Sequence, residues 1–127
     1  MMLYELYLPF PPTVNHYYVK TKRGVFISKK GREFRELVAD EIHEQLAGVH
    51  IPIDIKLQVE VTLFPRDKRK RDLDNYNKAL LDAITQCGLW EDDSQIDQLH
   101  NYRGELLKNG LCHVRITQAE DIKKAPE

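Results

Sequence analysis

The sequence predicts a small, single α/β domain in which a mixed β-sheet packs against two main helices. Residues 54–64 alternate strictly between apolar and polar side chains, which is typical of a strand with one buried face. Two segments, 28–48 and 74–86, carry apolar residues at helical spacing. Strand-like segments also lie near both ends of the chain. A length of 127 residues suits one domain, spanning 1–127.

The first half of the chain is expected to contain a strand, a hairpin and a helix. Residues 3–10 are strand-like and end in a proline-rich stretch. Residues 17–19 and 25–27 flank a cationic turn, which indicates a β-hairpin. The helix over 28–48 follows and ends at Gly48. Its predicted core face comprises Phe34, Leu37, Val38, Ile42 and Leu46.

In the second half, the strand over 54–64 is followed by a basic loop and a helix over 74–86 that ends at Gly88. Residues 96–106 and 111–117 are expected to pair as a closing hairpin, because Asn-Gly is a strong turn signal. The polar tail 118–127 is expected to fray. The helices are expected on one or both faces of the sheet.

Composition places the chain among ordinary globular proteins. It is 42% hydrophobic and 31% charged, with a formal net charge of −1. Any affinity for a polyanion must therefore come from local charge placement. No signal-peptide pattern is present, and no apolar run approaches the roughly 20 residues of a membrane span. Cys87 and Cys112 are expected to be free thiols, and the protein is expected to be cytoplasmic.

The segment from Arg66 to Asp93 carries the strongest chemical signal. A dense cationic run directly precedes Asp72 and Asp74, and Lys78 and an acidic cluster follow. The members are Arg66, Lys68, Arg69, Lys70 and Arg71, then Glu91, Asp92 and Asp93. Cations attract a polyanion, and convergent carboxylates bind a hard divalent cation. A polyphosphate backbone uses both, so the segment predicts a phosphodiesterase site.

Each feature also has a purely structural interpretation. Asp74 could cap the second helix, and Lys78 could pair with Asp74 or Asp82 at helical spacing. Their conjunction favours a site, because Asp72 and Asp74 point the same way in extended backbone. A helix of about 13 residues rises about 20 Å. Asp93 therefore reaches the other two aspartates only if the acidic loop folds back.

The same residues resemble the RusA family of Holliday junction resolvases. The matching stretches are Lys68–Asn75 (KRKRDLDN), Lys78 and Gly88–Asp93 (GLWEDD). Leu8–Tyr18 resembles the opening segment of that family, and Ser28–Gly31 precedes a helix as it does there. The resemblance extends over about residues 3–117.

This resemblance implies a homodimeric, Mg²⁺-dependent endonuclease that cuts four-way DNA junctions by paired, symmetric incisions. The family's three essential aspartates correspond to Asp72, Asp74 and Asp93, which are therefore the expected metal ligands. Its essential lysine corresponds to Lys78, and Asp92 is a further candidate. Two-fold symmetry of the dimer would suit two equivalent incisions.

Two groups of cations are candidates for contacts with DNA phosphates. They are Arg69, Lys70 and Arg71 in the basic run, and Lys20, Lys22 and Arg23 at the hairpin tip. Phe10, Tyr17 and Tyr18 could stack on exposed bases, but strand core or a dimer interface is the favoured interpretation. Trp90 is expected to pack over the end of the second helix.

Three rival functions remain open. An Asp-x-Asp motif also occurs in phosphohydrolases with an aspartyl nucleophile and in sugar-nucleotide transferases. In those enzymes an apolar strand leads directly into the motif, whereas here five cations precede it. The chain could instead be a non-catalytic DNA-binding module, or a nuclease of the same family that acts on flaps, forks or other branched DNA.

Overall fold

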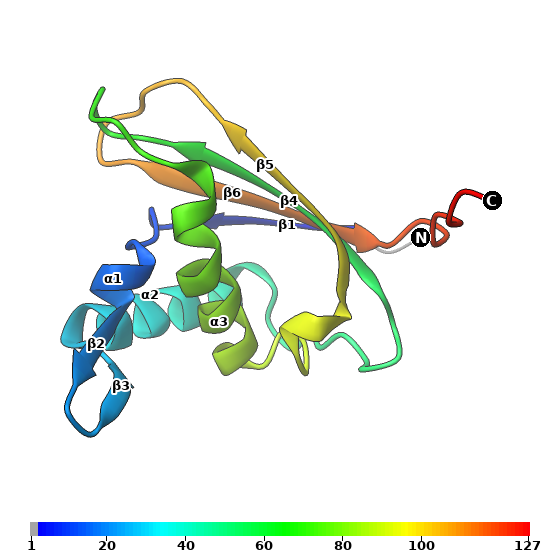
Figure 1. The fold of residues 1–127 in the computed structure, drawn as a ribbon, viewed down its shortest axis with the longest axis horizontal. Helices are drawn as coiled ribbons and strands as arrows, with labels where there is room; N and C mark the ends of the chain where they lie inside the picture. Colours follow the sequence, from blue (N-terminus) through cyan, green and yellow to red (C-terminus); the bar gives the residue numbers. More distant parts are fainter. Residues whose placement is uncertain (1–2) are drawn as a thin grey trace.

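The computed structural model describes residues 3–127, which form a four-stranded sheet with the main helices on one face, and a separate small hairpin (Figure 1). The strands are β1 (Leu3–Leu8), β2 (Tyr18–Thr21), β3 (Gly24–Ile27), β4 (Leu57–Phe64), β5 (Ile96–Arg103) and β6 (Leu111–Gln118). The helices are α1 (Val14–Tyr17), α2 (Lys29–Gln45) and α3 (Asn77–Cys87), with the 3₁₀ turns η1 (Leu73–Tyr76) and η2 (Asp93–Gln95). The predicted fold class is confirmed.

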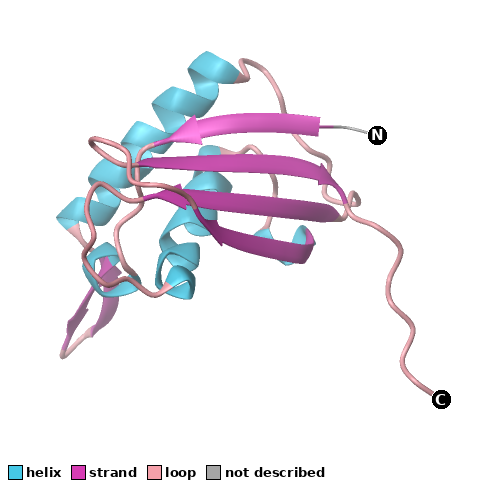
Figure 2. Cartoon of the chain, turned by 90° about the horizontal axis from the view of Figure 1, so that it is seen from above, coloured by secondary structure: helices cyan, strands magenta, loops and turns pink. Residues whose placement is uncertain are grey.

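The main sheet has the strand order β1-β6-β4-β5, with β5 at an edge (Figure 2). β4 lies inside it, parallel to β5 and antiparallel to β6. Alternate residues of β4 are buried, as the sequence predicts. The helices cover this buried face, so the other face of the sheet is free of them (Figure 1).

The predicted pairing of the last two strands is wrong, because β4 lies between β5 and β6. The Asn-Gly turn itself exists, with φ angles of 70° at Asn109 and 69° at Gly110. It is the last part of a connection over 104–110 that carries the chain past the end of β4. A turn signal fixes local backbone shape, whereas the strand partner depends on which apolar faces meet.

Helix α2 begins one residue after Ser28, whose Oγ accepts a hydrogen bond from the Gly31 amide at 3.0 Å. A Cβ at Gly31 would lie 2.4 Å from the Tyr17 carbonyl oxygen, so only glycine permits this approach of α2 to α1. Phe34, Val38 and Ile42 are buried, but Leu37 is 52% exposed. The expectation that Leu37 belongs to the core is therefore wrong.

Helix α3 is shorter than predicted at its start, because Leu73–Tyr76 form a 3₁₀ turn. It ends at Gly88, whose φ of 85° is left-handed, as predicted. Trp90 is fully buried beyond this end, and its Nε1 donates to Thr85 Oγ1 at 2.6 Å. The predicted packing of Trp90 is confirmed.

The hairpin β2–β3 projects from the helical side of the molecule (Figure 1). Residues 119–127 have no regular secondary structure. Cys87 and Cys112 are both free, as expected, although only Cys112 is fully buried. No helix within residues 3–127 is long and apolar enough to cross a membrane.

Candidate nucleic-acid interface and metal-binding carboxylates

The basic loop, defined as Arg66–Arg71, follows β4 directly and is organised around one carboxylate. Asp67 lies 3.0 Å from Arg69 Nη2 and 2.9 Å from Arg71 Nη2, and Arg66 Nε is 3.6 Å away. The Arg69 amide, and then the Arg71 and Arg69 side chains, donate hydrogen bonds that lower the pKa of Asp67 to about 2. Sequence reasoning missed this role, although Asp67 is the one acid inside the cationic run.

Arg71 acts mainly inside the loop. Its side chain is 16% exposed, and its Nη1 donates to the carbonyl oxygens of Asp67 and Arg69, both at 3.1 Å. Its guanidinium carbon also lies 5.7 Å from the centre of the Phe10 ring. Lys70, in contrast, is exposed and makes no ion pair within residues 3–127. Lys70 is therefore freer than Arg71 to contact an external phosphate.

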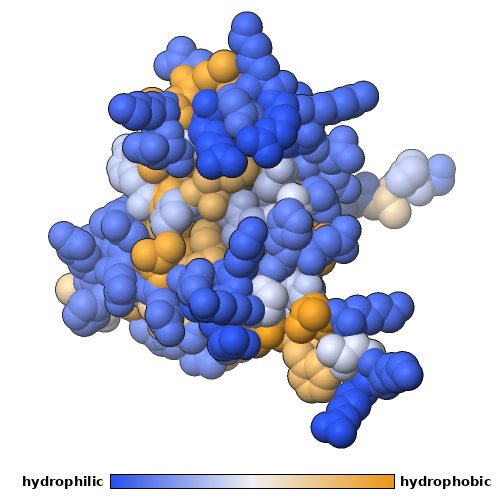
Figure 3. Space-filling view, turned by 90° about the vertical axis from the view of Figure 1, so that its left-hand side faces the viewer, coloured by the Kyte–Doolittle hydropathy of each residue, from blue (hydrophilic) through white to orange (hydrophobic). Residues whose placement is uncertain are grey.

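A cleft of about 580 Å³ lies between this loop and the proline-rich segment after β1. Phe10 and Tyr76 form part of its wall, and their ring centres are 5.2 Å apart. Its basic lining residues are His16, Lys30, Arg66, Arg69, Lys70 and Arg71. None of the described residues that line it is acidic. Figure 3 shows this side of the molecule, with polar side chains around a more apolar hollow.

Asp72 lies on the other side of the basic loop. It lines a second cleft, of about 460 Å³, between this loop and residues 103–106. Arg103 holds the backbone here, because its Nη2 donates to the Arg71 carbonyl oxygen at 2.5 Å. Asp72 is exposed, in extended backbone with φ −90° and ψ 127°. Its carboxylate is therefore accessible from solvent.

Asp74 does not cap helix α3, so the interpretation of this residue as a helix cap is wrong. It lies within η1, and α3 begins after Tyr76 with no side-chain capping bond. Asp72 occupies the position before η1 and makes no capping bond either. Both carboxylates are exposed, and neither makes a helix-capping hydrogen bond within residues 3–127. A role in stabilising the fold therefore does not account for them.

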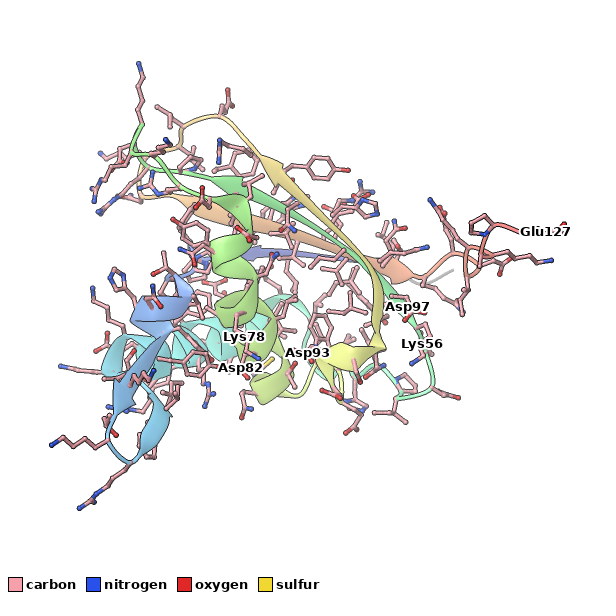
Figure 4. All side chains as sticks on the ribbon, viewed as in Figure 1. Lys56, Lys78, Asp82, Asp93, Asp97 and Glu127 are labelled. Carbon is pink, nitrogen blue, oxygen red and sulfur yellow. The ribbon has the colours of Figure 1, made fainter. Side chains whose placement is uncertain are left out.

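Lys78 does not form the ion pairs that the purely structural interpretation offered. It is exposed on the first turn of α3 and forms no ion pair with Asp74 or Asp82. Asp82, one turn further along α3, pairs instead with Arg35 of α2 at 2.8 Å. Figure 4 shows Lys78 and Asp82 on α3 and Asp93 at the start of η2.

The loop that presents Asp93 is held by Gln95, a residue that sequence reasoning missed. Gln95 is 1% exposed, and its Nε2 donates to the carbonyl oxygens of Pro52 and Ile55, both at 2.9 Å. Its Oε1 accepts from the amides of Glu91 and Asp92. A glutamine just before a strand gave no sequence signal for this role.

One chain does not bring the three aspartates together. Within residues 3–127 no group of three or more acidic, histidine or cysteine side chains could hold a metal ion. Asp72 follows β4, near the Arg103 end of β5, whereas Asp93 lies just before Ile96 at the other end. The expected meeting of Asp93 with Asp72 and Asp74 therefore does not occur within a single subunit.

Asp72 and Asp74 provide the kind of oxygen ligands that Mg²⁺ prefers. Mg²⁺ takes hard oxygen ligands, and it is usually held by one or two carboxylates together with water and substrate phosphates. Two accessible carboxylates two residues apart, beside a cationic loop, provide that donor set. These two residues could hold the ion without any other group of the chain.

The six predicted phosphate contacts fall on two separate parts of the surface. Arg69, Lys70 and Arg71 line the cleft of about 580 Å³. Lys20, Lys22 and Arg23 lie on the projecting hairpin and are all exposed. The three aromatic residues considered for base stacking differ in burial. Tyr17 is fully buried, whereas Phe10 and Tyr18 are half-buried.

Comparison with known proteins identifies the family. The family model described as "Endodeoxyribonuclease RusA" matches residues 9–117, which include the basic loop, all three aspartates and Lys78. The chain belongs to the RusA family. The match covers β4, β5 and β6 except the last residue of β6, and it leaves out β1.

Curated relatives cover nearly the whole chain. The crossover junction endodeoxyribonuclease RusA of Escherichia coli K12 is 32% identical over 118 residues, which are 93% of this chain and 97% of the relative. Relatives with the same name from Enterobacteria phages 82 and HK97 are each 33% identical, over 93% and 94% of this chain and 97% and 98% of their own lengths. The resemblance inferred from the motifs is thereby confirmed.

Proposed function

We propose that this chain is a Mg²⁺-dependent endonuclease that resolves four-way DNA junctions by paired phosphodiester hydrolysis. The observation that carries the proposal is the position of the accessible Asp72–Asp74 pair directly after a cationic loop, in a chain of the RusA family. The names of the relatives support the choice of crossover junctions as the substrate.

Asp72 and Asp74 are proposed to hold the metal ion, with Asp93 as a third acidic contributor. Bound there, Mg²⁺ would supply Lewis acidity toward the scissile phosphate. Lys78 lies on the first turn of α3, four residues after Asp74, and makes no ion pair with any residue in 3–127. We assign to its ammonium group a hydrogen bond to the phosphate, which would stabilise the charge that develops during hydrolysis.

The cleft beside the basic loop is proposed to hold the DNA backbone. It combines Arg69 and Lys70 with the apolar faces of Phe10 and Tyr76, and the described residues that line it include no acid. Cations position a strand through its phosphates, while aromatic rings accept unstacked bases of any sequence. Lys20, Lys22 and Arg23 on the hairpin would provide a second, separate set of phosphate contacts.

The deciding experiment is cleavage of a synthetic four-way junction in Mg²⁺ or EDTA, with Asp74→Asn alongside. Paired nicks in Mg²⁺ that are absent in EDTA and in the variant support the proposal. Metal-independent binding without cleavage would instead identify a DNA-binding module. Flap and fork substrates in the same panel test the junction preference, because faster cleavage of either would change the assigned substrate.

A further inference from the structure

Both peptide groups that flank Asp72 are held by hydrogen bonds. On its N-terminal side, the Arg71 carbonyl oxygen accepts from Arg103 Nη2 at 2.5 Å. On its C-terminal side, the Asp72 carbonyl oxygen accepts from the Asn75 amide at 3.2 Å. Because a peptide group is planar, a bond to its oxygen also restrains the orientation of the whole group. The direction in which Asp72 presents its exposed carboxylate therefore depends on Arg103 and on the turn η1.

Arg103 is the last residue of β5, and backbone contacts fix its position. It pairs with Leu63 of β4, and the next amide, that of Gly104, donates to the Leu63 carbonyl oxygen at 2.8 Å. A Cβ on Gly104 would lie 2.5 Å from two carbons of the Phe64 ring, so a larger residue would force this ring to move. The end of β5 is thus held against the end of β4, on the side of the sheet where α3 begins (Figure 1).

Arg71 is anchored separately from inside the basic loop. Its Nη2 lies 2.9 Å from Asp67 Oδ1, and its Nη1 donates to the carbonyl oxygens of Asp67 and Arg69. The side chain of Arg71 thus binds this residue to its own loop, whereas Arg103 binds its carbonyl oxygen to β5. Arg103 is therefore a direct link between the main sheet and the residue that precedes Asp72.

We infer that Arg103 is a positioning residue for the metal ligand Asp72, acting through the Arg71 carbonyl oxygen. This inference rests on the proposed function, which assigns Asp72 to Mg²⁺. Mg²⁺ requires near-ideal octahedral geometry, with ligands at about 2.0–2.1 Å. A carboxylate on a displaced backbone meets that requirement less well. Residues that orient a metal ligand through hydrogen bonds typically contribute about 10–100-fold to metal affinity or activity.

A direct contact with a DNA phosphate is the competing role for Arg103. Its side chain is exposed, and it lines the same cleft of about 460 Å³ as Asp72. The two roles affect different quantities. A phosphate contact contributes to DNA affinity and to its salt dependence, whereas a positioning residue contributes to metal affinity even without DNA.

A Mn²⁺ titration of the DNA-free protein, followed by paramagnetic broadening of the amide signals around Asp72, tests the positioning role. Mn²⁺ is a suitable probe because it takes the same oxygen ligands as Mg²⁺. Arg103→Ala should raise the midpoint by about 10-fold or more, and Arg103→Lys, which retains a donor, should restore most of the affinity. Arg115→Ala is the matched control, because Arg115 lies on β6 and pairs with Glu5 and Glu60. Its midpoint should equal that of the wild type.

An unchanged midpoint in Arg103→Ala would overturn the inference. A wild-type protein without broadening near Asp72 would overturn both the inference and the assignment of Asp72 to the metal. A wild-type protein that binds Mn²⁺ there but cleaves no junction would retain the positioning role and contradict only the proposed function.

Binding of a synthetic four-way junction in EDTA gives the second readout. Arg103→Ala should bind the junction as tightly as the wild type, with the same dependence on salt. A weaker affinity whose salt slope falls by about one, together with an unchanged Mn²⁺ midpoint, would assign Arg103 to a DNA phosphate and refute the positioning role.

Discussion

Arg35 Nη2 lies 2.8 Å from Asp82 Oδ2, and this ion pair joins α2 to α3 one turn away from Lys78. The Tyr17 hydroxyl donates to the same carboxylate and accepts a hydrogen bond from Arg35 Nε at 2.7 Å. Burial, and then the bond to Asp82, raise the pKa of Tyr17, so the phenol remains a donor. These contacts join α1, α2 and α3 one helical turn from the proposed catalytic lysine.

Asp82→Ala should destabilise the fold, because the buried Tyr17 hydroxyl and the Nη2 of the half-buried Arg35 would both lose the carboxylate that accepts their hydrogen bonds. The loss is expected to be about 1–3 kcal/mol, measured as a lower urea midpoint at unchanged slope. Glu33→Ala is the control, since its pair with Lys29 is 4.0 Å long and largely exposed. The control should change stability by less than about 0.5 kcal/mol. Equal effects of both variants would remove the structural role assigned to Asp82.

Lys78→Ala should lose about 10²–10³ in single-turnover cleavage, the usual effect of removing one electrostatic donor from a transition state. Junction affinity at the same ionic strength should be nearly unchanged. Lys68→Ala removes an exposed cation of the basic loop and should show the converse pattern, with weaker binding and an unaffected rate at saturation. Loss of folding in Lys78→Ala, seen by circular dichroism, would indicate a structural lysine.

Asp74→Asn should abolish metal-dependent cleavage and leave stability within about 0.5 kcal/mol of wild type. The physical reason is that Asp74 makes no helix-capping bond, so the fold does not require its charge. Calorimetric titration of Mg²⁺ in the presence of uncleavable junction should show weaker binding. Unchanged cleavage and metal binding in this variant would remove Asp74 from the site.

Gln95→Leu should cost about 1–3 kcal/mol, because the Ile55 carbonyl oxygen would lose its Gln95 donor and the amides of Glu91 and Asp92 would lose their acceptor. Cleavage should also fall at conditions where the variant remains folded, since the loop that presents Asp93 would lose its anchor. Gln86→Ala, on the exposed surface of α3, is the control and should be close to neutral. Full activity of a folded Gln95→Leu enzyme would contradict the positioning role.

The basic loop should lose its order at acid pH as Asp67 is protonated. The pKa of Asp67 is lowered from 3.8 to about 2 in the folded protein. A depressed folded-state pKa means that the stabilisation is present above about pH 4 and disappears as pH falls toward about 2. Carboxyl NMR titration should give the lowered pKa, and Asp67→Asn should remove the pH dependence of loop amide shifts. An Asp67 carboxyl that titrates near 3.8 would contradict the ion-paired loop.

Local patterns in the sequence were sufficient for much of the fold. Period-two alternation identified β4, helical spacing identified α2 and α3, and Gly88 marked the end of α3. These features depend on neighbouring residues, so they can be read without knowledge of distant contacts. The segment from Arg66 to Asp93 likewise identified the family, because its residue types and spacing are specific to the chemistry.

The tertiary structure decided what depends on partners distant in the chain. The Asn-Gly turn was predicted correctly, but the insertion of β4 between β5 and β6 was not. Asp82, a possible partner for Lys78 in the purely structural interpretation, pairs instead with Arg35, 47 residues away. The sequence by itself predicted which carboxylates would carry the proposed chemistry. The parallel pairing of β4 with β5 decided that Asp93 lies at the opposite end of a strand from Asp72, because strand direction is set by long-range packing and not by local residue order.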